Sequence, residues 1–221
     1  MADPGNVVIE LSNVVTGFPN RNVLSGVSLS VARGELVIIE GATGAGKTTL
    51  MRTLLGAQPL QSGYAKVLNT DLLRSTPFEL ERLRHRIGVI FQFAPFLNQE
   101  NVLTNAVVPL LIGGVPPRKC RAEGTRALVD VGLAGCARKK PLQLSGGEQA
   151  RLQIARALIH KPYLVLADEP FAHLDPESAI AAESLLAAVH ARGTAVVITT
   201  HRPTNLAAKA RRYRLEGGKL I

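Results

Sequence analysis

The sequence predicts an α/β fold with a mainly parallel β-sheet, a small antiparallel sheet and a helical insert. Short β-branched apolar runs alternate with segments of helical spacing along the 221-residue chain, which is typical of strand–helix–strand units in a parallel sheet. Polar residues directly follow several of these runs, as expected where ligands bind at the carboxyl ends of parallel strands. We expect residues 1–221 to form one domain, with a helical subdomain at about residues 93–160.

The amino-terminal half of the chain supplies most of the predicted strands. Residues 7–11 and 27–31 have strand-like composition, and the turn-rich residues 17–22 are expected to connect them. These two strands indicate the small antiparallel sheet. Further elements are expected, in chain order, as strand 36–40, helix 48–55, strand 64–68, helix 78–86 and strand 87–91.

Helical patterns dominate after residue 92, where β-branched runs become rare and Gly and Pro punctuate the sequence. A long helix is predicted from Gly146 to about His160. Asp175 as N-cap and Pro176 in the first turn mark the start of another helix. The remaining elements are expected as strand 163–167, helix 176–191 and strand 195–199.

The composition is that of a folded domain with a basic surface. Apolar residues make up 46% of the chain, enough for a sizeable core. Aromatic residues make up only 4% and Trp is absent, which argues against a base-stacking surface for single-stranded nucleic acid. The formal charge of +9 fits nucleic acid, an anionic membrane surface or a solvated face, so charge alone does not decide among them.

The cysteines and the hydropathy pattern indicate a cellular location. Cys120 and Cys136 are the only cysteines, and their spacing is not that of a metal site, so we expect free thiols in a reducing compartment. The first residues show no signal-peptide pattern. The most apolar stretch, residues 102–115, is too short and too broken to span a bilayer. We therefore expect a soluble, cytoplasmic protein.

A glycine-rich segment, residues 41–48, fits the phosphate-loop pattern GxxxxGK[ST]. It lies between a predicted strand and a predicted helix, where backbone N–H groups and the helix N-terminus attract phosphate. Lys47 can reach the β- and γ-phosphates of a nucleotide, and the Thr48 hydroxyl can ligate Mg²⁺. The predicted nucleotide-binding residues are Gly41, Ala42, Thr43, Gly44, Ala45, Gly46, Lys47, Thr48 and Thr49.

An acidic pair, Asp168 and Glu169, follows the predicted strand 163–167. At the carboxyl end of a buried strand beside the phosphate loop, Asp168 would hold Mg²⁺ and Glu169 would polarise the attacking water. The alternative is a pair that only caps the next helix. The phosphate loop favours the first interpretation.

Residues 144–149, Leu-Ser-Gly-Gly-Glu-Gln, resemble the LSGGQ-type signature of ABC ATPases, with Glu as a common variant. The other motifs of that family occur in its order and spacing over about residues 7–221. The resemblance implies a P-loop NTPase core of the RecA-like type, hydrolysis of ATP, and ATP and Mg²⁺ as ligands. The six motifs are the phosphate loop, Gln92, the signature, Asp168–Glu169, Leu174–Asp175 and His201.

The resemblance also implies roles for single residues. Gln92 is similar to the glutamine that senses Mg²⁺ and water, and His201 is similar to the histidine that contacts the γ-phosphate. Phe18 aligns with the aromatic that stacks on adenine, with a core aromatic as the alternative. The implied catalytic residues are Glu169, His201 and Gln92, and the implied Mg²⁺ ligands are Thr48, Gln92 and Asp168.

The signature predicts a second anion site, because Ser145 and the N–H groups of Gly146 and Gly147 lie at the start of a helix. In ABC ATPases this segment, which here includes Glu148, completes the γ-phosphate pocket of the opposite subunit. The resemblance therefore implies a head-to-tail homodimer that holds two ATP molecules. Two departures, Phe-Ala-His at residues 171–173 and Arg202 where relatives usually have Asp, are expected to alter contacts across this dimer.

Residues 83–92 and 102–112 resemble one subgroup, which contains the cell-division ATPase FtsE, the lipoprotein-release ATPase LolD and the macrolide-export ATPase MacB. The resemblance implies a partner, an integral-membrane permease of the FtsX-like or lipoprotein-release type, that holds the chain at the inner face of the cell membrane. The short chain after the last predicted strand favours the cell-division type. Lipoprotein release or macrolide export is the alternative.

The permease is expected to dock on the helical insert, close to Phe93, Pro95 and Phe96. The alternative is that these residues only pack the insert against the core. A hypothesis of another class is a soluble ABC ATPase that acts on nucleic acid. Its members carry long coiled-coil or zinc inserts, or two ATPase halves, and the sequence shows neither, so no nucleic-acid partner is expected.

Overall fold

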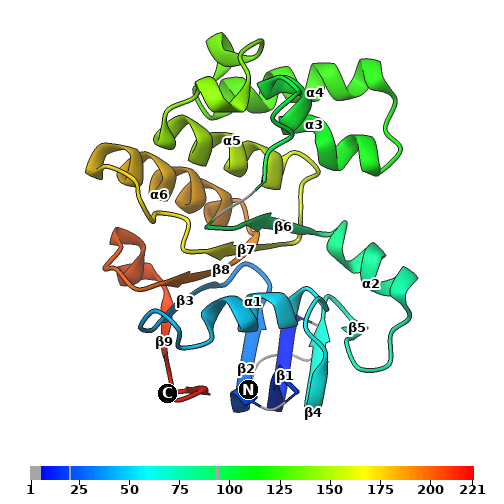
Figure 1. Cartoon of the computed structure of the whole chain (residues 1–221), viewed down its shortest axis with the longest axis vertical. Coiled ribbons are helices and arrows are strands. Elements are labelled where there is room, and N and C mark those ends of the chain that lie inside the picture. Colours follow the sequence, from blue (N-terminus) through cyan, green and yellow to red (C-terminus); the bar gives the residue numbers. More distant parts are fainter. Residues whose placement is uncertain (1–5, 20, 93–94) are drawn as a thin grey trace.

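The computed structural model describes residues 6–19, 21–92 and 95–221, and a parallel sheet lies at its centre (Figure 1). The strand order is β10-β9-β3-β8-β7-β6. All neighbouring pairs are parallel except β9 and β10. The strands are β3 (Leu36–Glu40), β6 (Ile87–Ile90), β7 (Leu164–Asp168), β8 (Ala195–Thr200), β9 (Arg211–Glu216) and β10 (Lys219–Leu220).

The predicted antiparallel sheet is also present, in the order β2-β1-β4-β5. Its first two strands are longer than expected, because residues 17 and 18 pair with residues 22 and 21. Gly17 lies opposite Asn22, and a Cβ at Gly17 would collide with the carbonyl oxygen of Arg21. The strands are β1 (Val7–Phe18), β2 (Arg21–Ala32), β4 (Leu60–Val67) and β5 (Thr70–Asp71).

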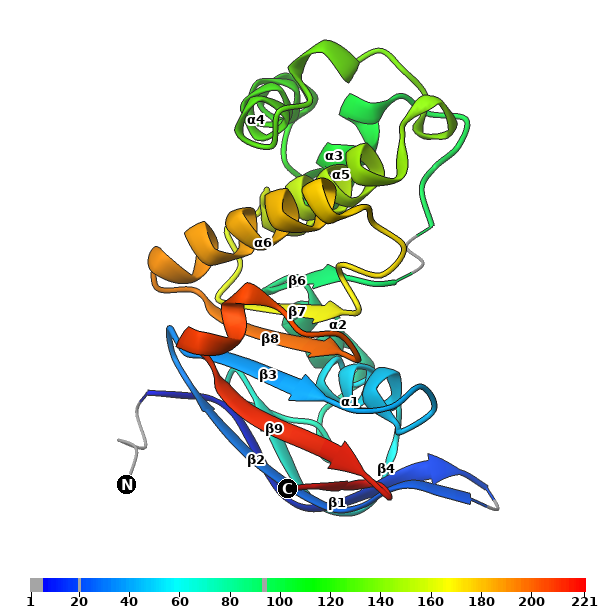
Figure 2. The same ribbon diagram turned by 90° about the vertical axis from the view of Figure 1, so that its left-hand side faces the viewer.

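Two apolar cores lie on opposite faces of the parallel sheet (Figure 2). Helix α1 (Lys47–Leu54) packs between this sheet and the antiparallel sheet, and its Leu50 and Leu54 are fully buried. Helices α5 (Gly146–Leu158) and α6 (Pro176–Ala191) cover the other face. Because both faces are covered, β7 and β8 are buried along their whole length.

The expected helical insert projects beyond α5 (Figure 2). Its helices α3 (Val102–Ile112) and α4 (Pro117–Asp130) pack against α5. The fully buried Asn105 holds the preceding loop, because its amide accepts from Leu97 N–H at 2.8 Å and donates to Leu97 O at 3.1 Å. The other helical segments are α2 (Pro77–Arg84) and the 3₁₀ helices η1 (Ala134–Cys136), η2 (Pro141–Gln143) and η3 (Asn205–Lys209).

The sequence analysis missed β5, β9 and β10, so the expectation that little follows the last strand is corrected. Strand β9 carries three arginines, which obscure the alternation of polar and apolar residues that is typical of a strand. Tyr213 and Leu215 face the first core, whereas Arg212 and Arg214 alternate with them. No helix in the described ranges combines the length and the apolar character needed to cross a bilayer.

Candidate functional site

The loop between β3 and α1 has a backbone that only glycine adopts readily. Gly44 and Gly46 have φ values of 83° and 105°, in the left-handed region. Gly46 is also the residue before the first turn of α1, and no described side chain caps that turn. The first N–H groups of α1 therefore point into the loop without a side-chain acceptor, which is the arrangement that binds phosphate.

Lys47 is buried, and its ammonium group lies over the loop. Nζ donates to Gly41 O at 2.7 Å and to Ala42 O at 3.0 Å. It also forms an ion pair with Glu169 Oε1 at 3.1 Å. A phosphate oxygen can replace each of these three acceptors of the lysine.

Asp168 ends β7 and is almost fully buried, with 3% of its surface exposed. Its Oδ2 accepts from the Thr48 hydroxyl at 2.7 Å, and its Oδ1 accepts from the Thr199 hydroxyl at 2.5 Å. Thr48 lies in the first turn of α1 and Thr199 lies on β8, so three elements meet at this carboxylate. The sequence analysis did not identify Thr199, because only the pairing of β7 with β8 brings it there.

Glu169 is held between the lysine and the histidine. Its Oε2 lies 2.8 Å from His201 Nδ1 and accepts from the His201 backbone N–H at 3.3 Å. Its own backbone has a φ of 49°, an uncommon conformation for a residue with a side chain. Backbone strain of this kind clusters at functional sites, and here it directs the carboxylate to Lys47 and His201.

One cavity of about 350 Å³ collects most of the predicted site residues. Phe18 lies at its edge with 55% of its surface exposed. Gly41 and Ala42 line a neighbouring cavity instead, and Ala45 packs against the first core. Arg21 and Val23 join the lining without a sequence signal. The cavity is lined by Phe18, Arg21, Val23, Thr43, Gly44, Gly46, Lys47, Thr48, Thr49, Gln92, Glu169 and His201.

The signature segment begins α5 with a capping box. The Ser145 hydroxyl accepts from Glu148 N–H at 3.2 Å, and Glu148 Oε2 accepts from Ser145 N–H at 2.8 Å. This backbone hydrogen bond from Ser145 lowers the pKa of Glu148. The N–H groups of Gly146 and Gly147 precede the capped one, so they face outward from the helix start.

None of residues 145–148 lines the cavity that holds Lys47. Within one described chain, the signature and the phosphate loop are therefore separate sites. Of the two departures noted in the sequence, Phe171 is buried in the second core, whereas Arg202 is exposed beside His201.

Chemically, the cavity combines an anion cradle, an ammonium group and the Glu169 carboxylate, and the Asp168 carboxylate at the end of the same strand, β7, bonds its lining residue Thr48. Comparison with known proteins agrees with this chemistry. A family model described as ABC transporter matches residues 24–172, more than half of the chain. The chain belongs to the ABC transporter ATPase family. It is an enzyme that hydrolyses ATP.

Two relatives show how far this family match extends. The lipoprotein-releasing system ATP-binding protein LolD of Geobacter metallireducens is 39% identical over 97% of this chain and 98% of its own. The cell division ATP-binding protein FtsE of Haemophilus influenzae is 34% identical over 88% and 90%.

A solved structure agrees with the fold. A dimeric ATP-binding cassette in a post-hydrolysis state, bound to ADP and Pi, has a TM-score of 0.87 and 30% identity, with 96% of both chains covered.

Proposed function

We propose that this ABC ATPase domain, residues 1–221, works as a homodimer that drives an integral-membrane permease from the inner face of the cell membrane. The observation that carries the proposal is the chain of contacts from Lys47 through Glu169 to His201 in one cavity. It joins a phosphate-binding cation to a carboxylate of the kind that activates water.

Lys47 exchanges its present acceptors for the phosphates of ATP. It leaves the carbonyl oxygens of Gly41 and Ala42 and the Glu169 carboxylate, and it then donates to the β- and γ-phosphate oxygens. Glu169 is released by this exchange and orients the attacking water. His201, already in contact with Glu169, faces the γ-phosphate, and Gln92 reaches the same cavity from the end of β6.

The residues present fit Mg²⁺. Thr48 Oγ1 and Asp168 Oδ2 are oxygen donors only 2.7 Å apart, and hydroxyl and carboxylate oxygens are the ligands this ion prefers. Gln92, which lines the same cavity, would add a further ligand. Bound there, the ion would neutralise charge on the β- and γ-phosphates.

The homodimer is supported by the separation of the two phosphate-binding elements within one chain. Ser145 and Gly146 are exposed at the start of α5, and buried Gly147 follows them, all outside the Lys47 cavity. A second copy in head-to-tail orientation would bring its signature to this cavity, and one relative of known structure is dimeric. ATP would then be held between the two chains.

A groove of about 470 Å³ is the candidate docking site for the permease. Val108, Pro109 and Ile112 of α3 form one wall, and Pro95 lies beside them. Phe96 does not line the groove: it packs against the second core, with the Arg156 guanidinium 5.1 Å from its ring centre. Phe93 lies outside the described residues. We therefore assign the contact with the permease, which the sequence analysis expected for Phe96, to Ile112. Ile112 is 65% exposed.

Two permease types are candidates. The LolD relative, at 39% identity over nearly the whole chain, supports a lipoprotein-release type. The FtsE relative supports the FtsX-like, cell-division type that the sequence analysis favours. Purification of the complex from membranes, followed by identification of the bound permease, separates the two types.

Glu169→Gln tests the reaction. The substitution keeps the shape of the side chain but removes the base, so ATP should still bind and turnover should fall by about 100-fold, or about 2.7 kcal/mol of barrier. Glu183→Gln is the matched control, because Glu183 is equally buried at 8% but bonds Asn205 outside the site. Equal turnover of the Glu169 and Glu183 variants would contradict the assignment.

Gly146→Glu in the Glu169→Gln background tests the dimer. Gly146 is exposed, and a Cβ added there would have no atom within 4 Å, so the cap of α5 stays intact. The added carboxylate repels phosphate, and the shift to dimer with Mg-ATP should be lost in sedimentation. Gly146→Ala should keep it. A dimer that ignores both ATP and Gly146→Glu refutes the proposal.

Ile112→Asp tests the groove. It places a charge on the apolar wall, and co-purification with the membrane permease should fall while ATP binding persists. Leu142→Asp is the control, since Leu142 is an exposed residue of the insert, at 75%, outside the groove. Equal recovery of permease by both variants places docking elsewhere.

A further inference from the structure

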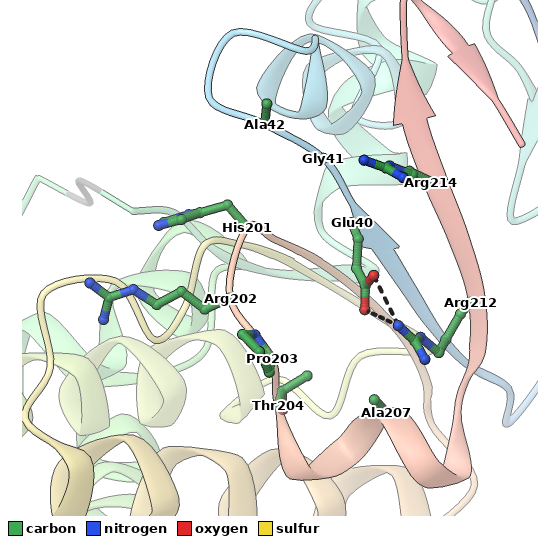
Figure 3. A pocket seen from close by; sticks show the side chains of 10 residues that line it. All are labelled: Glu40, Gly41, Ala42, His201, Arg202, Pro203, Thr204, Ala207, Arg212 and Arg214. Atoms are coloured by element: carbon green, nitrogen blue, oxygen red, sulfur yellow. Dashed lines mark hydrogen bonds and ion pairs between the residues drawn. The ribbon is translucent and has the colours of Figure 1, made fainter.

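A second cavity, of about 560 Å³, lies beside the ATP site (Figure 3). The end of β3, the middle of β9 and the loop after β8 form its walls. The proposed ATPase mechanism uses only His201 and the loop backbone from this lining, and leaves three arginines without a role.

The topology of the sheet creates this cavity. Strand β3 lies between β8 and β9, and all three are parallel. The chain leaves β3 toward α1 in the first core, but it leaves β8 toward η3, whose Leu206 packs in the second core. Connections that depart to opposite faces open a crevice at the carboxyl ends of parallel strands, where ligands bind in α/β folds.

The lining of the crevice has an excess of positive charge. Arg202, Arg212 and Arg214 line it together with one carboxylate, Glu40. Three guanidinium groups against one carboxylate leave two positive charges, with His201 counted as neutral. A phosphate monoester carries about −1.5 to −2 at pH 7, so its charge matches that of the cavity.

The arginines have donors to spare. Arg212 bonds both Glu40 oxygens, at 2.8 and 3.0 Å, with a single nitrogen, Nη2 (Figure 3). Among the described residues, the Arg214 guanidinium has one ion pair, an exposed contact of 3.6 Å from Nε to Glu216. Within the described part of the chain, the Arg202 guanidinium has no hydrogen bond or ion pair, and Figure 3 shows it at the far edge, directed away from Arg212 and Arg214.

Surface arginines usually serve only to keep a face of the protein solvated. That role does not account for the arrangement of these arginines around one cavity. Residues 212 and 214 share one face of β9, because side chains alternate along a strand. Arg211, on the other face, is instead paired with Glu35 at 2.8 Å. Pro203 and Ala207 add apolar surface to the same cavity, as expected of a small-molecule site with a few convergent polar groups.

We propose that this cavity binds a small organic phosphate, at a site distinct from the ATP site. The guanidinium groups of Arg212 and Arg214, which share one face of β9, hold the phosphate, because their forked donors match its oxygens. Arg202 adds positive charge at the far edge of the cavity, and the apolar wall packs the organic part of the ligand.

The site is joined to ATP hydrolysis by shared residues. His201 lines both cavities. Gly41 and Ala42 line the second cavity and also hold Lys47 through their carbonyl oxygens. A bound phosphate would therefore change the rate of ATP hydrolysis. This effect on the rate rests on the proposed function, whereas the binding of the phosphate does not.

Calorimetric titration of the full chain with glucose 6-phosphate, at saturating Mg-ADP, tests the binding. Arg212→Ala and Arg214→Ala should each weaken binding by about tenfold or more, the usual effect of losing a charged hydrogen bond. Their affinity for Mg-ADP should stay unchanged. Arg211→Ala is the matched control, since it removes the same charge from the other face of β9 and should bind as the unmodified protein does.

Three results would overturn the proposal. The first is that glucose 6-phosphate fails to bind at millimolar concentration. The second is binding lost in Lys47→Ala but kept in both arginine variants, which places the anion on the phosphate loop. The third is an equal loss in the Arg211 variant, which shows a general charge effect. Inorganic phosphate that binds as tightly as glucose 6-phosphate would overturn the organic part of the assignment.

Discussion

Replacing Thr199 with valine removes one hydroxyl and leaves the shape of the side chain almost unchanged. That hydroxyl donates to Asp168 Oδ1 at 2.5 Å, and both residues are buried. Thr48 still reaches the other carboxylate oxygen, so the change isolates a single hydrogen bond. It leaves Oδ1 without its donor, in a place that is 3% exposed.

A hydrogen bond to a charged group contributes about 1.5–3 kcal/mol. We take about 2 kcal/mol for this one, because the acceptor oxygen loses its partner where water has little access. For a chain of this length, each kcal/mol shifts the melting temperature by about 2–4 °C. Thr199→Val should therefore lower it by roughly 4–8 °C.

Urea denaturation and a thermal melt, both followed by circular dichroism, measure the effect. Thr199→Ser is the control, since it restores the hydroxyl and should recover most of the stability. The apparent affinity for Mg²⁺ in the presence of ATP should also weaken in the valine variant, because Asp168 loses part of its orientation. A free energy of unfolding within about 0.5 kcal/mol of the unmodified protein, a margin typical of neutral surface changes, would refute the reasoning.

Two further outcomes are expected. Gly147→Ala should destabilise the fold by about 1–3 kcal/mol, because a Cβ there collides with Ser178 at the start of α6, whereas Gly146→Ala meets open space; equal denaturation midpoints would contradict this packing. Burial lowers the pKa of His160 from its ordinary value of 6.5, so the unfolded chain takes up the proton first. Stability should then fall as the pH drops through 6.5, and His160→Gln should show a flatter pH dependence in urea titrations.

Short motifs determined much of the site in advance. The phosphate loop, the acidic pair and the signature are contiguous segments, and each is preceded or followed by a strand or a helix of clear period. Their chemistry is carried by the order of residues along the chain. The predicted elements around them, such as α6 with its cap at Asp175, lie where the sequence placed them.

Only the tertiary structure decided which distant groups share a surface. Thr199 joins Asp168 because β7 and β8 pair in one register, and no local pattern encodes a partner that is 31 residues away. The charged face of β9 could not be predicted from the sequence either. The arginines of β9 obscure its alternation of polar and apolar residues, which becomes evident only from its pairing with β3. Strand order and register arise from burial summed over the whole chain. Local spacing therefore determined the chemistry of this ATPase, and long-range packing determined which residues carry it out together.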